Sequence, residues 1–187
     1  MSGSVIHPTA IVAPTAELAA GVSIGPYAVI GPRVRLGAET QIGAHCVVEG
    51  RTTLGARNAV FAHVAVGTAP QDLKFHGEDS ELIVGDDNRI REFCTVQPGT
   101  EGGGMITRIG NGNLLMNYTH VAHDCLIGDR NIVANGTQLG GHVTIESYAV
   151  LGALSAVHQF ARIGESAIVG AGSMVSQDVP PFCNATG

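Results

Sequence analysis

The chain has 187 residues, a net charge of −6 and an aromatic content of only 4%, together with 26 glycines. The acidic balance argues against nucleic acid as a partner, and no apolar stretch reaches the ~18 residues that a membrane span needs. No signal peptide precedes the first repeat, so the sequence predicts a cytoplasmic protein whose single domain covers residues 1–187.

An aliphatic residue recurs at every sixth position in three runs, which cover residues 6–66, 84–96 and 109–175. A period of six fits neither an α-helix nor the two-residue alternation of a strand. It is typical of an all-β fold, the hexapeptide-repeat parallel β-helix, in which three hexads make one triangular coil. Residues about 18 apart should then stack on neighbouring coils at roughly the 4.8 Å strand spacing.

Two segments interrupt the repeat and predict loops that protrude from the rod. The first covers about residues 67–83, is polar with Pro and Gly, and contains Lys74, the sole lysine of the chain. The second covers about residues 97–108 and is rich in glycine. Loops on a rigid scaffold are where binding and catalytic residues concentrate, although both segments could also be tolerated insertions.

The four cysteines do not predict a metal site or a disulfide. Cys46, Cys94 and Cys125 each follow an aliphatic anchor by four positions, where a small residue packs inside the coil, and Cys183 lies outside this pattern. No Cys-x-x-Cys motif is present. The cysteines therefore read as packing residues.

Three of the eight histidines, His120, His123 and His142, fall close together when the offset of about 18 is applied. A neutral imidazole can take a proton from an attacking alcohol, a carboxylate can orient that ring, and a glycine N–H can stabilise an oxyanion. The alternatives are solvated histidines on a flat surface, or zinc held by three histidines as in the hexapeptide-repeat carbonic anhydrases. The ligand pattern of those enzymes is not found here, and we expect no metal. The patch comprises His123, Asp124, Gly141, His142 and Gln159, with His120 beside it.

The segment Val121-Ala-His123-Asp124-Cys125, preceded by His120, resembles the catalytic segment of the UDP-N-acetylglucosamine O-acyltransferases that begin lipid A synthesis. The similarity runs through the whole chain in order and includes both loops. Further matching motifs lie at residues 71–74, 85–92, 113–116, 140–142, 156–160 and 177–181.

This resemblance implies a left-handed coil and a homotrimer that transfers a 3-hydroxyacyl group from acyl carrier protein to the glucosamine 3-hydroxyl, without a cofactor. It implies that His123 is the general base, that Asp124 orients it and that the Gly141 amide lies in the oxyanion hole. Ala171 occupies the position that limits acyl-chain length in the family. The residues implied in substrate binding are Gln71, Asp72, Lys74, His120, His142 and Gln159.

Two departures from the family are visible. Many members carry His-Arg where this chain has Gln97-Pro98. The family also continues into a C-terminal helical domain, and we expect none within residues 1–187. The other interpretations are an acyltransferase of the same fold that acts on a 3-amino sugar nucleotide, an acetyl-coenzyme A enzyme, and a non-catalytic trimeric scaffold.

Overall fold

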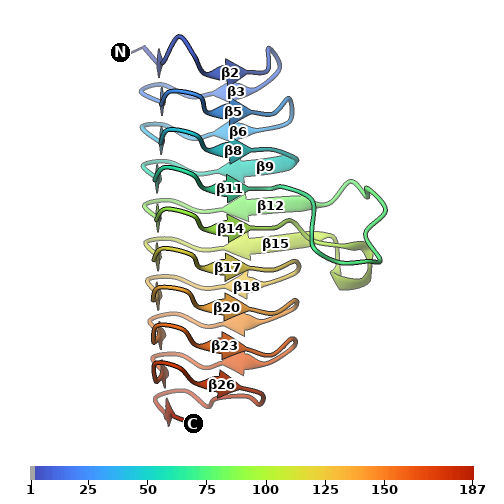
Figure 1. The fold of residues 1–187 in the computed structure, drawn as a ribbon, viewed down its shortest axis with the longest axis vertical. Coiled ribbons are helices and arrows are strands. Elements are labelled where there is room, and N and C mark those ends of the chain that lie inside the picture. Colours follow the sequence, from blue (N-terminus) through green and yellow to red (C-terminus); the bar gives the residue numbers. More distant parts are fainter. Residues whose placement is uncertain (1–2) are drawn as a thin grey trace.

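The structure, a computed structural model, describes residues 3–187, so Met1 and Ser2 lie outside the described part of the chain. It is a left-handed parallel β-helix whose coils stack along one axis, with the two ends of the chain at opposite ends of the rod (Figure 1). The predicted fold class is confirmed. Among the described residues, no helix is both long and apolar enough to cross a membrane.

Three parallel sheets form the faces of the prism. Sheet A contains β1 Val5–Ile6, β4 Ser23–Ile24, β7 Gln41–Ile42, β10 Ala59–Val60, β13 Arg89–Ile90, β16 Leu114–Leu115, β19 Ile132–Val133, β22 Val150–Leu151, β25 Ile168–Val169 and β27 Asn184–Ala185. Sheet B contains β2 Ile11–Val12, β5 Val29–Ile30, β8 Val47–Val48, β11 Ala65–Val66, β14 Thr95–Val96, β17 His120–Val121, β20 Gln138–Leu139, β23 Ala156–Val157 and β26 Met174–Val175. Sheet C contains β3 Glu17–Leu18, β6 Arg35–Leu36, β9 Arg51–Leu54, β12 Glu81–Val84, β15 Ile106–Ile109, β18 Leu126–Ile127, β21 Thr144–Ile145 and β24 Arg162–Ile163.

From β4 to β26, the second residue of each two-residue strand is the aliphatic anchor and is buried inside the prism. Ile30, Leu115 and Leu151 are among these anchors and are fully buried. Burying one branched side chain per face supplies the apolar area that holds so narrow a core together. Strand partners are 18 residues apart in most of the rod, as predicted, 30 apart across the first loop and 25 apart across the second.

Both loops leave the rod at the corner between sheets B and C and protrude on the same side (Figure 1). The first follows β11 and the second follows β14; the second contains the short 3₁₀ helix η1, Glu101–Gly103. Each loop ends earlier than the sequence predicts, because β12 and β15 are four-residue strands that begin at Glu81 and Ile106 and pair in register. The backbone N–H of Gln71 donates to Oε1 of Gln97 at 3.1 Å and ties the loops together.

Cys46, Cys94 and Cys125 are buried, which confirms their predicted packing role, whereas Cys183 is exposed. Burial raises the pKa of the Cys94 thiol to about 11 and that of Cys125 to about 12. Inert, protonated thiols are expected of cysteines inside an apolar core.

A column of buried asparagines crosses four coils at the corner between sheets C and A. Each asparagine side chain accepts a hydrogen bond from the backbone N–H of the next asparagine, with Asn88 bonded to Asn58 at 2.9 Å and Asn113 bonded to Asn88 at 2.9 Å. The backbone N–H of Asn131 continues the column to Asn113 at 2.8 Å. These bonds satisfy backbone groups where the turns interrupt the sheets.

Candidate active site

The candidate site lies at the corner between sheets B and C, in the turns that follow β17, β20 and β23. The His142 N–H donates to the His123 carbonyl at 3.0 Å, and the Phe160 N–H donates to the Gly141 carbonyl at 3.1 Å. Asp124 has a φ of 60° and His142 a φ of 64°, so both side chains project outward from the same tight corner. The predicted vertical stacking of these residues is confirmed.

Asp124 provides a buried carboxylate beside the His123 ring. Its side chain is 0% exposed, and its Oδ2 lies 2.8 Å from Nδ1 of His123. An ionised carboxylate can only accept, so this bond assigns the neutral ring a proton on Nδ1 and a lone pair on Nε2. The ring is 16% exposed, so part of the imidazole remains accessible.

The two loops form one wall of a cleft of about 400 Å³ beside this pair; its lining includes Asp72, Lys74, Thr100, His142 and Phe160. Oδ2 of Asp72 lies 4.0 Å from Nε2 of His123, on the side of the ring opposite Asp124. The ring of His142 stacks on Phe160 with centroids 4.3 Å apart and meets His123 edge-on at 5.1 Å. A reacting hydroxyl placed between Nε2 and the loop would therefore be surrounded by polar groups.

Gly141 lies directly against the His123 ring. A Cβ at residue 141 would stand 2.6 Å from Cε1 and 2.7 Å from Nε2 of that imidazole. Among residues 3–187, no acceptor is paired with the Gly141 N–H. A free backbone donor next to the base is what stabilisation of an oxyanion requires.

Known proteins resemble this chain over most of its length. The pattern described as "Bacterial transferase hexapeptide (six repeats)" matches residues 106–141. The acyl-[acyl-carrier-protein]–UDP-N-acetylglucosamine O-acyltransferase of Aliarcobacter butzleri is 56% identical over 182 residues, which cover 97% of this chain and 70% of that protein. The enzyme of the same name from Xylella fastidiosa is 53% identical over 179 residues, which cover 96% of this chain and 68% of that protein.

This chain belongs to the UDP-N-acetylglucosamine O-acyltransferase family. A crystal structure of the Moraxella catarrhalis member superimposes with a TM-score of 0.94 at 42% identity, covering 97% of this chain and 71% of that one. The fold and the chain path are thus those of the family.

His120 lies next to the cleft on the outer face of sheet B. Its Nδ1 is 2.6 Å from Oγ1 of Thr95, which holds the half-buried ring in one orientation. Burial and the neighbouring His123 lower the pKa of His120 below its ordinary value. The neutral ring can therefore serve as a hydrogen-bonding group for a substrate of this family.

Of the predicted residues, Asp72, Lys74 and His142 line the cleft, and the others lie outside its lining. Gln71 is exposed and contacts Gln97 through its backbone. Gln159 is exposed on the coil after Gly141, and Ala171 is exposed in the turn after β25, at the other edge of sheet B. Their predicted roles in the family reaction stay predictions.

The sequence did not point to three residues that surround Asp124. Thr100 and Gly103 in the second loop, and Thr107 in β15, all approach this aspartate. Their only signal was membership of a glycine-rich segment near the histidines, and a loop without a repeat carries no register from which a contact could be predicted.

His123, Asp124 and His142 could hold a metal ion, since one ligand atom from each lies within 4.8 Å of the others. Both carboxylate oxygens of Asp124 already accept hydrogen bonds, from Thr100 and from His123. These bonds match a carboxylate that orients an imidazole, as in acyl-transfer sites. They match less well a metal site, in which the carboxylate oxygens would be free to coordinate the ion.

Proposed function

We propose that this chain transfers a 3-hydroxyacyl group from acyl carrier protein to the glucosamine 3-hydroxyl of UDP-N-acetylglucosamine, the first step of lipid A synthesis. The observation that carries the proposal is the buried Asp124 carboxylate on Nδ1 of His123, with Nε2 lying 4.0 Å from Oδ2 of Asp72, a residue that lines the polar cleft. The names of the related enzymes support the same reaction. No cofactor is needed, because an alcohol and a thioester exchange the acyl group directly.

In this mechanism, Nε2 of His123 takes the proton of the 3-hydroxyl as its oxygen attacks the thioester carbonyl. Asp124 stabilises the imidazolium that forms, and the Gly141 N–H stabilises the oxyanion. Collapse of the tetrahedral intermediate breaks the carbon–sulfur bond. The departing thiolate then receives the proton from His123, which returns the base to its neutral form.

The cleft supplies groups suited to the sugar nucleotide. Lys74 is exposed at the cleft and offers a compact cation to a phosphate oxygen. Asp72 lies 4.0 Å from Nε2 of His123, and the His142 ring meets the His123 ring edge-on, so both residues are placed to bind sugar hydroxyl or amide groups. We assign supporting contacts to His120, Gln71 and Gln159, and a limit on acyl-chain length to Ala171.

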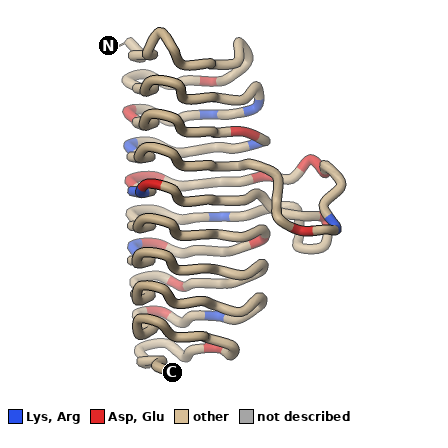
Figure 2. Tube along the Cα trace, viewed as in Figure 1, with Lys and Arg blue, Asp and Glu red and all other residues tan. Residues whose placement is uncertain are grey.

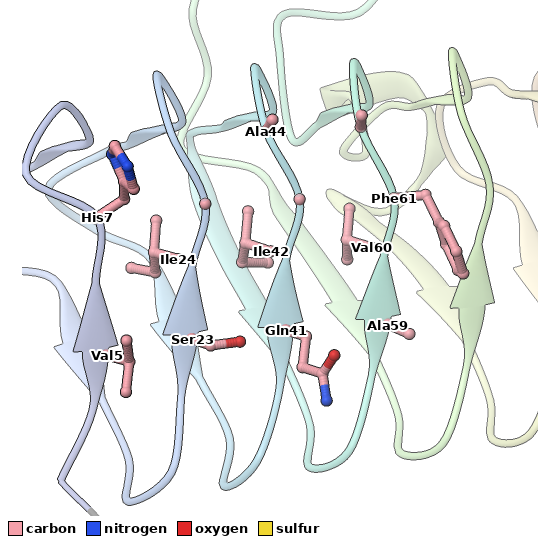
Figure 3. Close-up of a pocket in the computed structure, with 13 residues that line it drawn as sticks. Val5, His7, Ser23, Ile24, Gln41, Ile42, Ala44, Ala59, Val60 and Phe61 are labelled. Atoms are coloured by element: carbon pink, nitrogen blue, oxygen red, sulfur yellow. The ribbon is translucent and has the colours of Figure 1, made fainter.

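We further propose a homotrimer that associates through sheets A and B. Sheet B has no charged residue in any of its strands, and sheet A has only Arg89. The strands of sheet B are uncharged along the whole rod in Figure 2, whereas charges lie on sheet C, on the first loop and along the edge of the rod opposite the loops. Near the N-terminal end, sheet A carries a mostly apolar hollow of about 400 Å³, and the side chains of Val5, Gln41 and Ala59, from neighbouring strands, lie along it (Figure 3). Uncharged faces of this extent are typical of subunit interfaces.

The proposed function is tested by mass spectrometry of products from UDP-N-acetylglucosamine, its 3-amino analogue and a panel of 3-hydroxyacyl carrier proteins. We expect O-acylated product from the unaltered chain and none from His123→Ala, with circular dichroism confirming that the variant is folded. Product only from the amine analogue would assign the chain to the amine-acylating class. Product from neither acceptor would overturn the proposal.

A further inference from the structure

We propose that the second loop acts as a clamp on Asp124, in which Thr100 and Gly103 are positioning residues that set the proton of His123 on Nδ1. The catalytic consequence rests on the proposed function, whereas the positioning itself does not. Thr100 and Gly103 both contact the Asp124 carboxylate, so both would act on His123 through Asp124.

Thr100 makes two hydrogen bonds to the Asp124 carboxylate. Its backbone N–H donates to Oδ1 at 2.9 Å, and its hydroxyl donates to Oδ2 at 2.7 Å. Thr100 is itself 4% exposed. Two donors from one residue, one to each oxygen, fix both the position and the plane of the carboxylate, and such bonds to an ionised group are among the strongest in proteins.

The hydroxyl of Thr100 does not cap the helix that follows it. Thr100 is the N-cap residue of η1, where a threonine side chain commonly accepts a hydrogen bond from a backbone N–H of the first helical turn. Here the side chain makes no such bond and donates to Asp124 instead. The 3₁₀ helix therefore lacks a capping hydrogen bond from Thr100, whose hydroxyl bonds to Asp124 of the His123–Asp124 pair.

Gly103 allows the loop to close over the carboxylate. A Cβ at residue 103 would overlap the carboxylate carbon and both oxygens of Asp124. The close approach of this backbone is what leaves the Asp124 side chain 0% exposed. The neighbouring Gly102 has nothing within 4 Å of its would-be Cβ. A Cβ would therefore overlap Asp124 at residue 103 but not at residue 102.

The clamp determines which lone pair of the Asp124 carboxylate is left to accept a hydrogen bond from His123. With Oδ1 and one direction of Oδ2 occupied by Thr100, the remaining lone pair of Oδ2 faces Nδ1 at 2.8 Å. The Asp124 backbone is held separately, because its N–H donates to Oγ1 of Thr107 at 2.8 Å. Loosening the clamp should let the carboxylate rotate, and the ring would then also populate the tautomer with the proton on Nε2, which cannot act as a base.

The test compares Thr100→Val, which removes only the hydroxyl bond, with Thr100→Ser, which restores it, and Thr40→Val as a matched control. Thr40 is a buried threonine of a distant corner, whose hydroxyl donates to the Gly55 carbonyl at 2.7 Å. Histidine ¹⁵N spectra report the tautomer of His123 when they are recorded at a pH above the ordinary histidine pKa of about 6.5. The signals of His123 are identified by their absence in His123→Gln.

We expect an Nε2–H population in Thr100→Val and in Gly103→Ala, and the parental Nδ1–H form in Thr100→Ser, Thr40→Val and Gly102→Ala. In an active enzyme, Thr100→Val should lower kcat by roughly 10- to 100-fold with the KM for UDP-N-acetylglucosamine nearly unchanged. An unchanged tautomer in folded Thr100→Val and Gly103→Ala would overturn the clamp. If Thr100→Val does not fold, the comparison of Gly103→Ala with Gly102→Ala tests the clamp alone. A tautomer change in a chain that makes no product would uphold the clamp and refute the proposed function.

Discussion

Gly141 and His123 stack so closely that no side chain fits between them: a Cβ at residue 141 would stand 2.6 Å from Cε1 of the ring. The predicted base and the predicted oxyanion donor therefore come from the same position of adjacent coils. The register of the β-helix fixes their separation, so the rod itself supplies the rigid geometry that general-base catalysis needs.

Gly141→Ala should inactivate the protein without unfolding it. The added methyl group would push the His123 ring out of line, and a displacement of about 1 Å can cost on the order of 100-fold in rate. We expect kcat to fall by that amount while the thermal unfolding midpoint changes little. Activity equal to that of the unaltered chain would show that the ring has room to move, and would argue against the proposed role of this glycine.

Lys74→Met should weaken the binding of UDP-N-acetylglucosamine. Lys74 is the sole lysine and lies at the cleft next to Asp72, whose Oδ1 accepts the Lys74 backbone N–H at 3.0 Å. Losing the cation should raise KM by about 10-fold with a smaller effect on kcat, and added salt should affect the variant less than the parent. Lys74→Arg should retain most of the binding. Equal KM values for the parent and Lys74→Met would show that Lys74 does not bind a phosphate of the substrate.

The repeat made the rod and half of the site predictable. A period of six fixes which residues stack, so the placement of His142 and Phe160 over the coil that carries His123 followed from spacing alone. The four-residue strands were missed because the inward side chains of Leu82 and Thr107 lie outside the six-residue anchor series.

The other half of the site comes from the loops and was not predictable from spacing. The approach of Asp72 to His123 and of Thr100 to Asp124 depends on how each loop folds back on the rod. No periodicity relates a loop residue to the coil it touches, and the resemblance named Asp72 but not Thr100. Contacts of this kind are set by polar satisfaction and steric fit, which appear only once the coordinates are known.

Stability should decrease below about pH 6.5, in part because of His120. Burial and His123 lower the pKa of His120 in the folded protein, so the unfolded chain binds its proton first as the pH falls. The stabilisation by the neutral ring is thus complete above the ordinary histidine value and is lost progressively below it. Urea unfolding of the parent and of His120→Gln between about pH 7.5 and pH 5 should give a shallower pH slope for the variant. Identical slopes would contradict this assignment.

Removing the Asn88 side chain should destabilise the rod strongly. Its side-chain Nδ2 donates to the Gly110 carbonyl at 2.9 Å, and its Oδ1 accepts both the backbone N–H and the Nδ2 of Asn113 at 2.9 Å. Asn88→Ala would leave these buried groups without partners, and the free energy of unfolding should fall by roughly 2–5 kcal/mol.

The matched control for Asn88→Ala is Asn135→Ala, because Asn135 is exposed and makes one long contact to Asn117 at 3.5 Å. Its effect on the free energy of unfolding should stay within about 0.5 kcal/mol. Equilibrium urea unfolding measures both values. A loss in Asn88→Ala no larger than that of the control would mean that water replaces the missing partners. The asparagine column would then owe its place in the turns to backbone conformation instead of to hydrogen bonding.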